Sequence, residues 1–174
     1  MMKMTYDKGA NLTTKELWRE DTQHRDSGGY NLVLEGLPVG TYVAKGTPLS
    51  VDTKKRTAKV CVRVRVVGGS GTTMNVAKGS FIKVGDTVAE QKVNSINTAN
   101  SEYDVLTLAG AGTFKSGDVL SVDKNVPNRL SYSPVKVEAG AVIDAVNFAD
   151  EVEEDKLSLT QEDKKALGAR FLFV

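Results

Sequence analysis

The strongest pattern in the 174-residue sequence is one alternating run, which reads Lys59-Val60-Cys61-Val62-Arg63-Val64-Arg65-Val66-Val67. A valine occupies every second position, and basic or small side chains stand between the valines. Successive side chains of a β-strand point to opposite faces, so a period of two predicts a half-buried strand whose valines face a core. The sequence Gly68-Gly69-Ser70-Gly71 comes next and predicts a turn.

Shorter apolar runs on both sides of this strand predict further strands. They cover residues 31–35, 41–44, 74–77, 81–84, 87–96, 103–109, 119–122, 135–137 and 141–148. Many short strands with turns about every 8–12 residues are typical of barrels and sandwiches. We therefore expect a mainly β protein, built as a small β-barrel or sandwich, whose β-rich domain spans residues 31–150.

Two pairs of short phrases resemble each other. The first pair is Val43-Ala44-Lys45-Gly46-Thr47 and Val76-Ala77-Lys78-Gly79-Ser80. The second pair is Phe81-Ile82-Lys83-Val84-Gly85-Asp86 and Phe114-Lys115-Ser116-Gly117-Asp118. One interpretation is a weak internal repeat. The other is that β proteins reuse turn chemistry, because glycine adopts positive φ and aspartate bonds the nearby backbone.

Residues 1–30 are polar and contain few side chains that could contribute to a core. We interpret this segment as an N-terminal arm that docks on a partner, and Trp18, the only tryptophan, favours this interpretation. A disordered tail is the alternative, because chain ends are often poorly ordered. The candidate docking residues are Leu12, Leu17 and Trp18.

Residues 151–174 combine an acidic stretch, one predicted helix and an apolar strand. Ser158 or Thr160 can cap the helix, because Gln161 or Asp163 three positions later completes a capping box. Gly168 is a suitable helix stop. An apolar terminal strand is rarely left in water, so we expect it to pair with a sheet or with another subunit. The candidate oligomer contacts are Phe171, Leu172, Phe173 and Val174.

Residues for catalysis and metal binding are scarce. The chain has one cysteine, Cys61, and one histidine, His24, which excludes an internal disulfide and any site built on several thiolates or imidazoles. A serine or cysteine nucleophile needs a base, and His24 lies in the polar arm while Cys61 lies in mid-strand. We therefore expect no catalytic site, no metal and no cofactor. The rival is a carboxylate enzyme, but we expect acids such as Asp86 and Asp118 to be turn formers.

The near-neutral charge argues against nucleic acid as a partner, and the lack of long apolar runs argues against insertion into a membrane. The formal net charge is +1, whereas proteins that bind nucleic acid by releasing counterions usually carry a basic excess. The most basic stretch, residues 54–65, is expected to be the solvated face of an edge strand, and contact with an acidic partner is the alternative. No run approaches the roughly 18 apolar residues of a membrane helix, and no signal peptide is evident. We expect synthesis in a cytoplasm, without nucleic-acid binding or membrane insertion.

Three segments resemble phage head proteins. Gly112-Thr113-Phe114-Lys115-Ser116-Gly117-Asp118-Val119-Leu120 resembles the Gly-Thr-Phe…Asp-Val-Leu stretch of lambda-type capsid decoration proteins. Leu37-Pro38-Val39-Gly40-Thr41, followed by Gly46-Thr47-Pro48-Leu49, is similar to the opening of head fibre and decoration domains. Pro134-Val135-Lys136-Val137-Glu138-Ala139-Gly140 is similar to the later part of head fibre proteins from phages of gut bacteria.

This resemblance implies a non-enzymatic structural protein of the virion. Such head fibre and decoration subunits bind the major capsid protein as homotrimers, with a polar N-terminal arm added to a capsid sheet and a compact β domain projecting outward. The resemblance places the protein on the capsid surface after synthesis in the host cytoplasm, and a host surface glycan is a further partner of the outer face. Residues 151–174 depart from the family pattern.

Two other functions compete with this interpretation. A β-rich receptor- or carbohydrate-binding module would use exposed loop aromatics, for which Tyr103 and Tyr132 are candidates. A barrel-type RNA-binding domain is disfavoured, because the charge is near neutral and no aromatic residues alternate with the basic ones.

Overall fold

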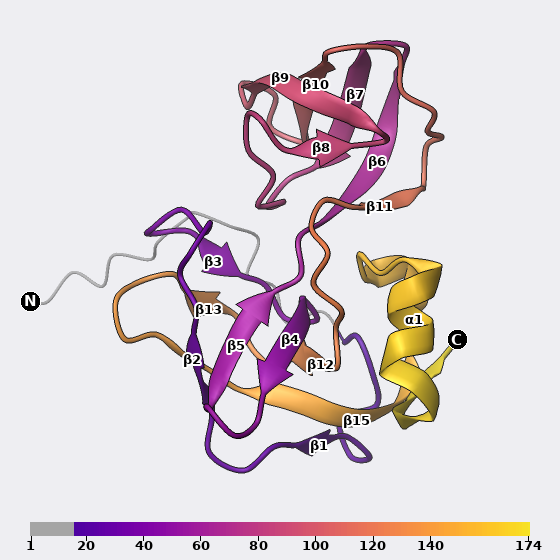
Figure 1. The fold of residues 1–174 in the computed structure, drawn as a ribbon. Coiled ribbons are helices and arrows are strands. Elements are labelled where there is room, and N and C mark those ends of the chain that lie inside the picture. The colour runs from indigo at the N-terminus through magenta and orange to yellow at the C-terminus, as the bar shows by residue number, and fades with distance from the viewer. Residues whose placement is uncertain (1–15) are drawn as a thin grey trace, which may run out of the picture.

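The alternating run of residues 59–67 is divided between two bodies in the computed structural model, which describes residues 16–174. Its first part ends β5 (Thr57–Val60), its last part begins β6 (Arg63–Ser70), and Cys61 and Val62 connect the two strands. We call residues 63–122 the outer lobe, and residues 16–62 with 123–174 the base lobe (Figure 1). The outer lobe is therefore an insertion, which leaves the base lobe after β5 and returns to it at residue 123.

The outer lobe is one six-stranded sheet that is nearly closed into a barrel. Besides β6, its strands are β7 (Thr73–Ala77), β8 (Thr87–Val88), β9 (Gln91–Asn97), β10 (Tyr103–Leu108) and β11 (Val119–Ser121). They pair in the order β11-β6-β7-β10-β9-β8, and every pair is antiparallel. The core of this lobe consists of Val64, Val66, Met74, Val76, Ile82, Val88, Val93, Leu106 and Leu108.

Two turns of the outer lobe, residues 83–86 and 115–118, have the same hydrogen bonds. In each, the aspartate carboxylate accepts a bond from the lysine amide, at 2.8 and 2.7 Å, and the glycine has a φ of +97° or +94°. The Gly-Asp backbone exchanges two bonds with Val93 in the first turn and with Val66 in the second. Exchanging β6, β7 and β8 with β9, β10 and β11 gives the same strand order, read from the opposite edge of the sheet. The two halves of the outer lobe are therefore related by an approximate twofold axis.

The base lobe contains the other strands and the helices. Besides β5, they are β1 (His24–Arg25), β2 (Tyr30–Leu32), β3 (Tyr42–Val43), β4 (Pro48–Asp52), β12 (Arg129–Ser131), β13 (Val135–Lys136), β14 (Val142–Ile143), β15 (Ala145–Val152), β16 (Phe171–Phe173), α1 (Gln161–Leu167) and the 3-10 turns η1 (Glu154–Lys156) and η2 (Gly168–Arg170). The main sheet has the order β1-β15-β12-β4-β5-β2-β14, and β16 pairs in parallel with β15. A small sheet joins β3 and β13.

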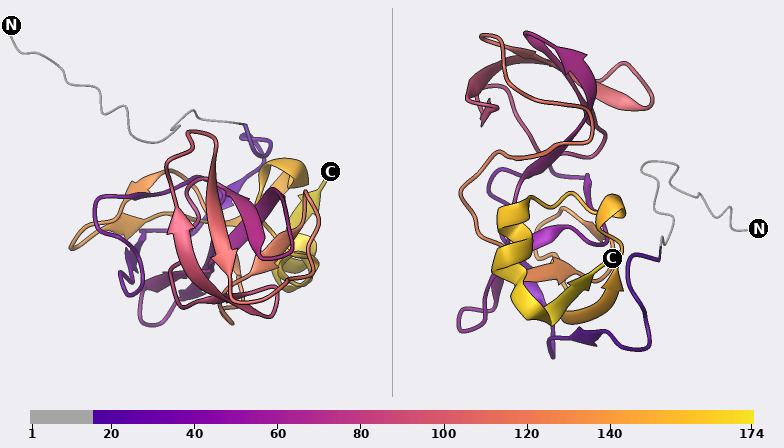
Figure 2. Two further views of the ribbon diagram at one scale, coloured as in Figure 1. Left: turned by 90° about the horizontal axis from the view of Figure 1, so that it is seen from above. Right: turned by 90° about the vertical axis from the view of Figure 1, so that its right-hand side faces the viewer.

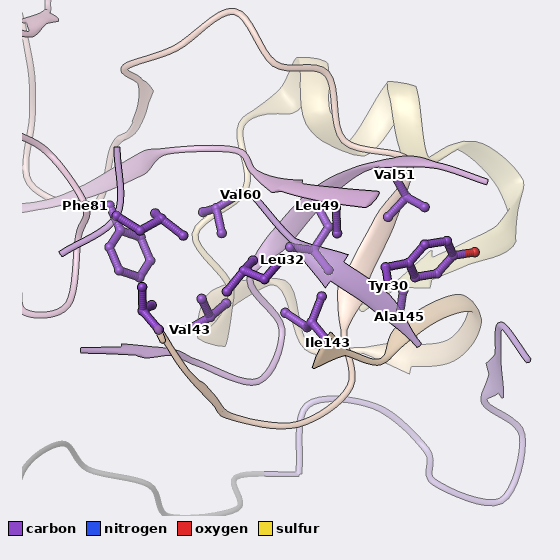
Figure 3. Close-up of a cluster of buried hydrophobic side chains, with 12 residues drawn as sticks. Tyr30, Leu32, Val43, Leu49, Val51, Val60, Phe81, Ile143 and Ala145 are labelled. Atoms are coloured by element: carbon purple, nitrogen blue, oxygen red, sulfur yellow. The ribbon is translucent and has the colours of Figure 1, made fainter. Parts of the chain in front are cut away.

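Two apolar clusters fill the base lobe. The first contains Tyr30, Leu32, Leu37, Val43, Leu49, Val51, Ala58, Val60, Phe81, Val137, Ile143 and Ala145 (Figure 3). Phe81 comes from the outer lobe, so this cluster also holds the two lobes together. The second contains Leu17, Trp18, Leu130, Val146, Ala149, Val152, Leu157, Leu159, Leu167 and Phe171.

The expected mainly β fold with one short C-terminal helix is confirmed, with 41% of residues in strands and 8% in helices. Thr160 caps α1 and forms the capping box with Asp163, and Gly168 ends the helix with a φ of +66°. The apolar terminal strand pairs with β15 of its own chain. Figure 2 shows α1 and β16 together on one side of the base lobe. No helix within residues 16–174 is long and apolar enough to cross a bilayer.

The arm expected over residues 1–30 needs a correction from residue 16 onward. Leu17 and Trp18 are only 4% and 3% exposed. The backbone here runs along β15, because the amide of Arg19 donates to the carbonyl of Asp150 and the amide of Glu153 donates to the carbonyl of Leu17. The polar composition of this segment did not indicate that it packs on the base lobe, because two large apolar side chains are enough to anchor it in the core.

Candidate functional site at the junction of the lobes

Arg63 lies where the chain passes from the base lobe into the outer lobe. Its side chain is buried, and Nε and Nη2 donate to the two carboxylate oxygens of Asp163 at 2.7 and 2.8 Å. Nη1 donates to Asp123 Oδ1 and to the carbonyl of Val62, both at 2.9 Å. Nη2 also donates to the carbonyl of Asn125 at 2.8 Å. All five guanidinium N–H groups therefore have acceptors.

Asp163 extends this arrangement into helix α1. Its carboxylate also accepts a hydrogen bond from the amide of Thr160 at 3.0 Å, and its own amide donates to the Thr160 hydroxyl at 3.1 Å. Burial raises the pKa of the Asp163 carboxyl, but the hydrogen bonds from Arg63 and Thr160 outweigh burial and hold this pKa below its ordinary value. Asp163 therefore stays ionised at neutral pH and fixes α1 against the first strand of the outer lobe.

This burial corrects the expectation that the basic stretch is a solvated strand face. Lys59 is exposed as expected, but Arg63 is only 8% exposed. Arg65 is half-buried, and its Nη2 donates to the carbonyl of Leu157. The reason is that β6 leaves the base lobe beside the C-terminal segment, so the basic face of this strand meets protein in place of water.

The two residues considered for nucleophilic chemistry lie in different surroundings. Cys61 is buried, and burial raises the pKa of its thiol to about 12, so the sulfur is uncharged at neutral pH. His24 is exposed on β1, where its ring packs edge-on against Phe148 with the centroids 5.6 Å apart. Within residues 16–174, no three His, Cys, Asp or Glu side chains are arranged to hold a metal ion.

A cleft of about 160 Å³ lies between the two lobes. Residues 44–48 and 156–158 of the base lobe line it, together with Arg65 and residues 77–81 of the outer lobe. The similar phrases Ala-Lys-Gly-Thr and Ala-Lys-Gly-Ser therefore meet in one cleft, one from each lobe. Their likeness is the sequence signal that marks the site, although the sequence does not reveal that the two phrases lie close in space.

The cleft lining, as the described residues form it, contains five basic side chains and no acidic one. These side chains are Lys45, Arg63, Arg65, Lys78 and Lys156. All except Arg65 form ion pairs with carboxylates outside the lining, which belong to Glu20, Asp104, Asp123, Glu153 and Asp163. Arg65 forms no ion pair with any carboxylate of the described residues. Its positive charge is therefore the one in this lining that lacks a compensating partner within residues 16–174.

The cleft also contains a hydroxyl without a hydrogen bond. The side-chain oxygen of Ser80 is buried and has no partner among residues 16–174. The equivalent hydroxyl of the other phrase, on Thr47, donates to the carbonyl of Ala44 at 2.7 Å. Buried polar groups almost always have partners, and Ser80 Oγ, Trp18 Nε1 and Gln23 Oε1 are the exceptions among the side chains of residues 16–174.

The predicted docking and oligomer residues fall into two groups. Leu17, Trp18 and Phe171 share the second core cluster, so their side chains are not available to a partner in this structure. Leu172 and Val174 are 59% and 65% exposed, whereas Phe173 is half-buried. Leu12 lies outside the described residues.

Two large apolar side chains are exposed on the outer face of β15 and β16. Ala149 pairs with Phe171, and both point into the core. Because neighbouring side chains of a strand alternate, Phe148 and Leu172 point to the opposite face of the sheet, where both are exposed.

The tyrosines considered for sugar binding are both half-buried. Tyr132 packs against the second core cluster, and the guanidinium of Arg25 lies 4.1 Å from its ring centroid. Tyr103 begins β10, where it pairs with Ala77. No observation at these two rings favours a glycan.

Comparison of the chain with known protein families, curated proteins and solved structures gave no match.

Proposed function

We propose that the protein is a non-enzymatic structural subunit of a tailed-phage particle, a head fibre or capsid decoration protein that binds the major capsid protein. The observation that supports this proposal is the two-lobe plan, in which a small barrel is inserted into a base lobe and stands off from it (Figure 1). Such a plan suits a protein that attaches through one lobe and presents the other.

Two of the segments that resemble head proteins form glycine turns followed by strands, one segment in each lobe. Residues 112–120 form the turn 115–118 and then β11 of the outer lobe. Residues 37–49 form two glycine turns with β3 between them and then β4 of the base lobe. The resemblance therefore follows whole turn-and-strand units, which adds support to the proposal.

Attachment through the base lobe accounts best for the apolar surface. Phe148, Leu172 and Val174 are exposed on this lobe. In the proposed particle, Leu172 and Val174 contact a neighbouring copy within a homotrimer, and three copies together engage the capsid with increased avidity. The capsid-docking role that the resemblance implies for the N-terminal segment falls to Leu12, because Leu17 and Trp18 are core residues.

Quantitative mass spectrometry of density-purified particles from the source culture tests the capsid role. We expect this chain at a fixed, high copy number relative to a major capsid protein. Particles that lack the chain, or carry only traces, would refute the proposal and leave a free β-rich binding module as the leading function.

The oligomer contact can be tested in solution with Leu172→Asp. We expect light scattering coupled to size exclusion to give a trimer for the unchanged chain and a smaller species for the variant, because a charge on an apolar contact is costly to bury. Val39→Asp is the matched control, since Val39 is 76% exposed on a turn of the same lobe. A monomeric unchanged chain, or equal masses for all three proteins, would contradict the contact.

A further inference from the structure

The hairpin between β8 and β9 has a strained turn. Val88 pairs with Gln91 across this turn. The two residues between them, Ala89 and Glu90, have φ values of +48° and +62°. Two-residue hairpin turns with positive φ at both positions usually have the sequence Asn-Gly. The left-handed conformation is unfavourable for L residues that have a Cβ. Within residues 16–174, this is the only place where two adjacent residues other than glycine have positive φ.

The strained turn is the covalent link between the two halves of the outer lobe. Residues 63–88 contain β6, β7 and β8, and residues 91–122 contain β9, β10 and β11. Three strand pairs join the halves, namely β6 with β11, β7 with β10 and β8 with β9. The core of the lobe also takes side chains from both halves, for example Val66 and Leu106. Each half therefore needs the other to complete its sheet and its core.

The same turn divides the base lobe. Strands β2 and β4 precede the turn, and they pair with β14 and β12, which follow it. The ion pair of Arg63 with Asp163 also joins the two sides. The segments 16–88 and 91–174 therefore complete both lobes for each other. When a second copy supplies residues 91–174, all these strand pairs are rebuilt and only the turn changes.

We propose that two copies of this chain exchange residues 91–174, with Ala89 and Glu90 extended as hinges between the copies. Each composite unit then contains one complete base lobe and one complete outer lobe, and the exchange releases the backbone strain of both turns. Short strained hinges favour such an exchange, and a two-way exchange closes a symmetric dimer. A closed chain holds its two segments at an effective concentration of roughly millimolar, so exchange is favoured where copies are concentrated. This association does not use Leu172 and does not depend on the capsid function proposed above.

Disulfide cross-linking between two full-length variants tests the exchange. Thr73 on β7 lies directly opposite Thr107 on β10, and both are exposed. Thr73→Cys and Thr107→Cys chains are mixed, unfolded in urea with a reductant, refolded together at roughly millimolar concentration and then oxidised. The two new thiols become neighbours when β7 of one copy pairs with β10 of the other. We expect covalent dimers on a denaturing gel, and at least about tenfold fewer after refolding at micromolar concentration.

A mixture of Thr73→Cys and Ser95→Cys chains is the matched control. Ser95 is exposed on β9 and pairs with Thr107, so it lies one strand further from Thr73. Two strand spacings are about 10 Å, which exceeds the roughly 7 Å between Cα atoms that a disulfide can span. This pair therefore measures cross-linking by chance encounter. Cys61 is buried and is present in every sample.

The double substitution Ala89→Asn with Glu90→Gly tests the hinge. The sequence Asn-Gly suits the turn, so this variant stabilises the closed chain without changing either half. Added to both cysteine variants, it should lower the yield of covalent dimers at least about tenfold. Light scattering of refolded Leu172→Asp chains gives a second readout without added cysteines, in which the Asn-Gly turn should reduce the fraction of dimer.

Two results would overturn the proposal. Equal cross-linking by the test pair and by the Ser95→Cys pair would show that copies do not exchange residues 91–174. A yield of covalent dimers that the Asn-Gly turn leaves unchanged would show that strain at the turn does not drive the exchange.

Discussion

The two lobes use the same short strands and glycine turns, but the chain builds them in different ways. The outer lobe is one continuous segment, so all of its strand pairings, including that of its first strand β6 with its last strand β11, join residues within 63–122. The base lobe joins distant segments, because β12 pairs with β4 and β14 pairs with β2. Non-local pairing is slow to form, since loop-closure entropy must be lost before the contacts form. Similar turns and strands therefore build one lobe from a single segment and the other lobe from two segments that are far apart in the sequence.

The contacts between the lobes are few but specific. Phe81 extends the apolar core of the base lobe into the outer lobe, and Arg63 ties β6 to α1 through Asp163. The remaining core residues of the outer lobe form a cluster of their own. The lobes are thus separate in their cores and joined by these contacts at the junction, which leads to four predictions.

Arg63→Met should have the largest effect. The variant leaves the carboxylate of Asp163 buried without its cation, and breaking a buried ion pair in this way costs roughly 3–5 kcal/mol. Urea unfolding followed by the fluorescence of Trp18, which lies in the base-lobe core, measures this loss. Lys59→Met is the control, because Lys59 is exposed on the adjoining strand. A loss no greater than that of the control would show that the junction does not stabilise the base lobe.

Leu130→Ala and Leu106→Ala compare the two cores directly. Both leucines are fully buried, the first in the base lobe and the second in the outer lobe. Each substitution should lower the free energy of unfolding by roughly 2–5 kcal/mol. Hydrogen exchange should then speed up mainly in the lobe that carries the substitution. Equal acceleration in both lobes for either variant would mean that the lobes unfold as one unit.

Gly85→Ala and Gly117→Ala test the approximate symmetry of the outer lobe. Both glycines have positive φ, and an added Cβ meets nothing within 4 Å at Gly117 and only Lys92 Cε at 3.9 Å at Gly85. Backbone strain alone should therefore cost about 1–2 kcal/mol at each site. Thermal unfolding should give similar losses for both. Gly68→Ala, at a glycine without positive φ, serves as the control, and clearly unequal losses at the two turns would break the equivalence.

A dependence on pH should act on the base lobe. Burial raises the pKa of Asp26 and Asp163, but hydrogen bonds to Arg129 and Arg63, among others, outweigh it, so both pKa values lie below the ordinary 3.8. Their contribution to stability is complete above about pH 4 and is lost as the pH falls through the folded-state values. Urea unfolding at a series of acidic pH values should show this decline. An Asp163→Asn variant should have a shallower decline, and an equally steep one would exclude Asp163 as a source.

Local features of the sequence predicted local structure well. Neighbouring residues alone predicted a stop at Gly168, which is confirmed, and two alternative capping boxes, of which the one formed by Thr160 and Asp163 is present. The period of two in residues 59–67 was also informative, because Val60, Val64 and Val66 are buried. Alternation describes only the faces of a strand, so it could not predict that the run passes from one lobe into the other.

Long-range features were not predictable from the same patterns. Arg63 was expected in water, and its partner Asp163 lies 100 positions further along the chain. Trp18 was expected on an arm, but it packs in a core with residues near the other end of the chain. The only sequence signal for the cleft was the similarity of the two phrases around Lys45 and Lys78. These phrases lie close together because of how the two lobes pack, which their similarity does not indicate. Each failure concerns which distant segments meet, which composition and periodicity do not encode.

The insertion of the outer lobe has a consequence for the order of events during translation. All its strands have been synthesised by residue 122, whereas β12, β14 and β15 of the base lobe follow later. At roughly 5–20 residues per second, residues 123–174 take about 3–10 s to make, whereas small all-β domains fold in milliseconds to seconds. During those seconds β4 and β2 lack their later partners β12 and β14. The nascent chain therefore carries a finished barrel beside an open sheet, and that interval is when the base lobe is most exposed to aggregation and to chaperones.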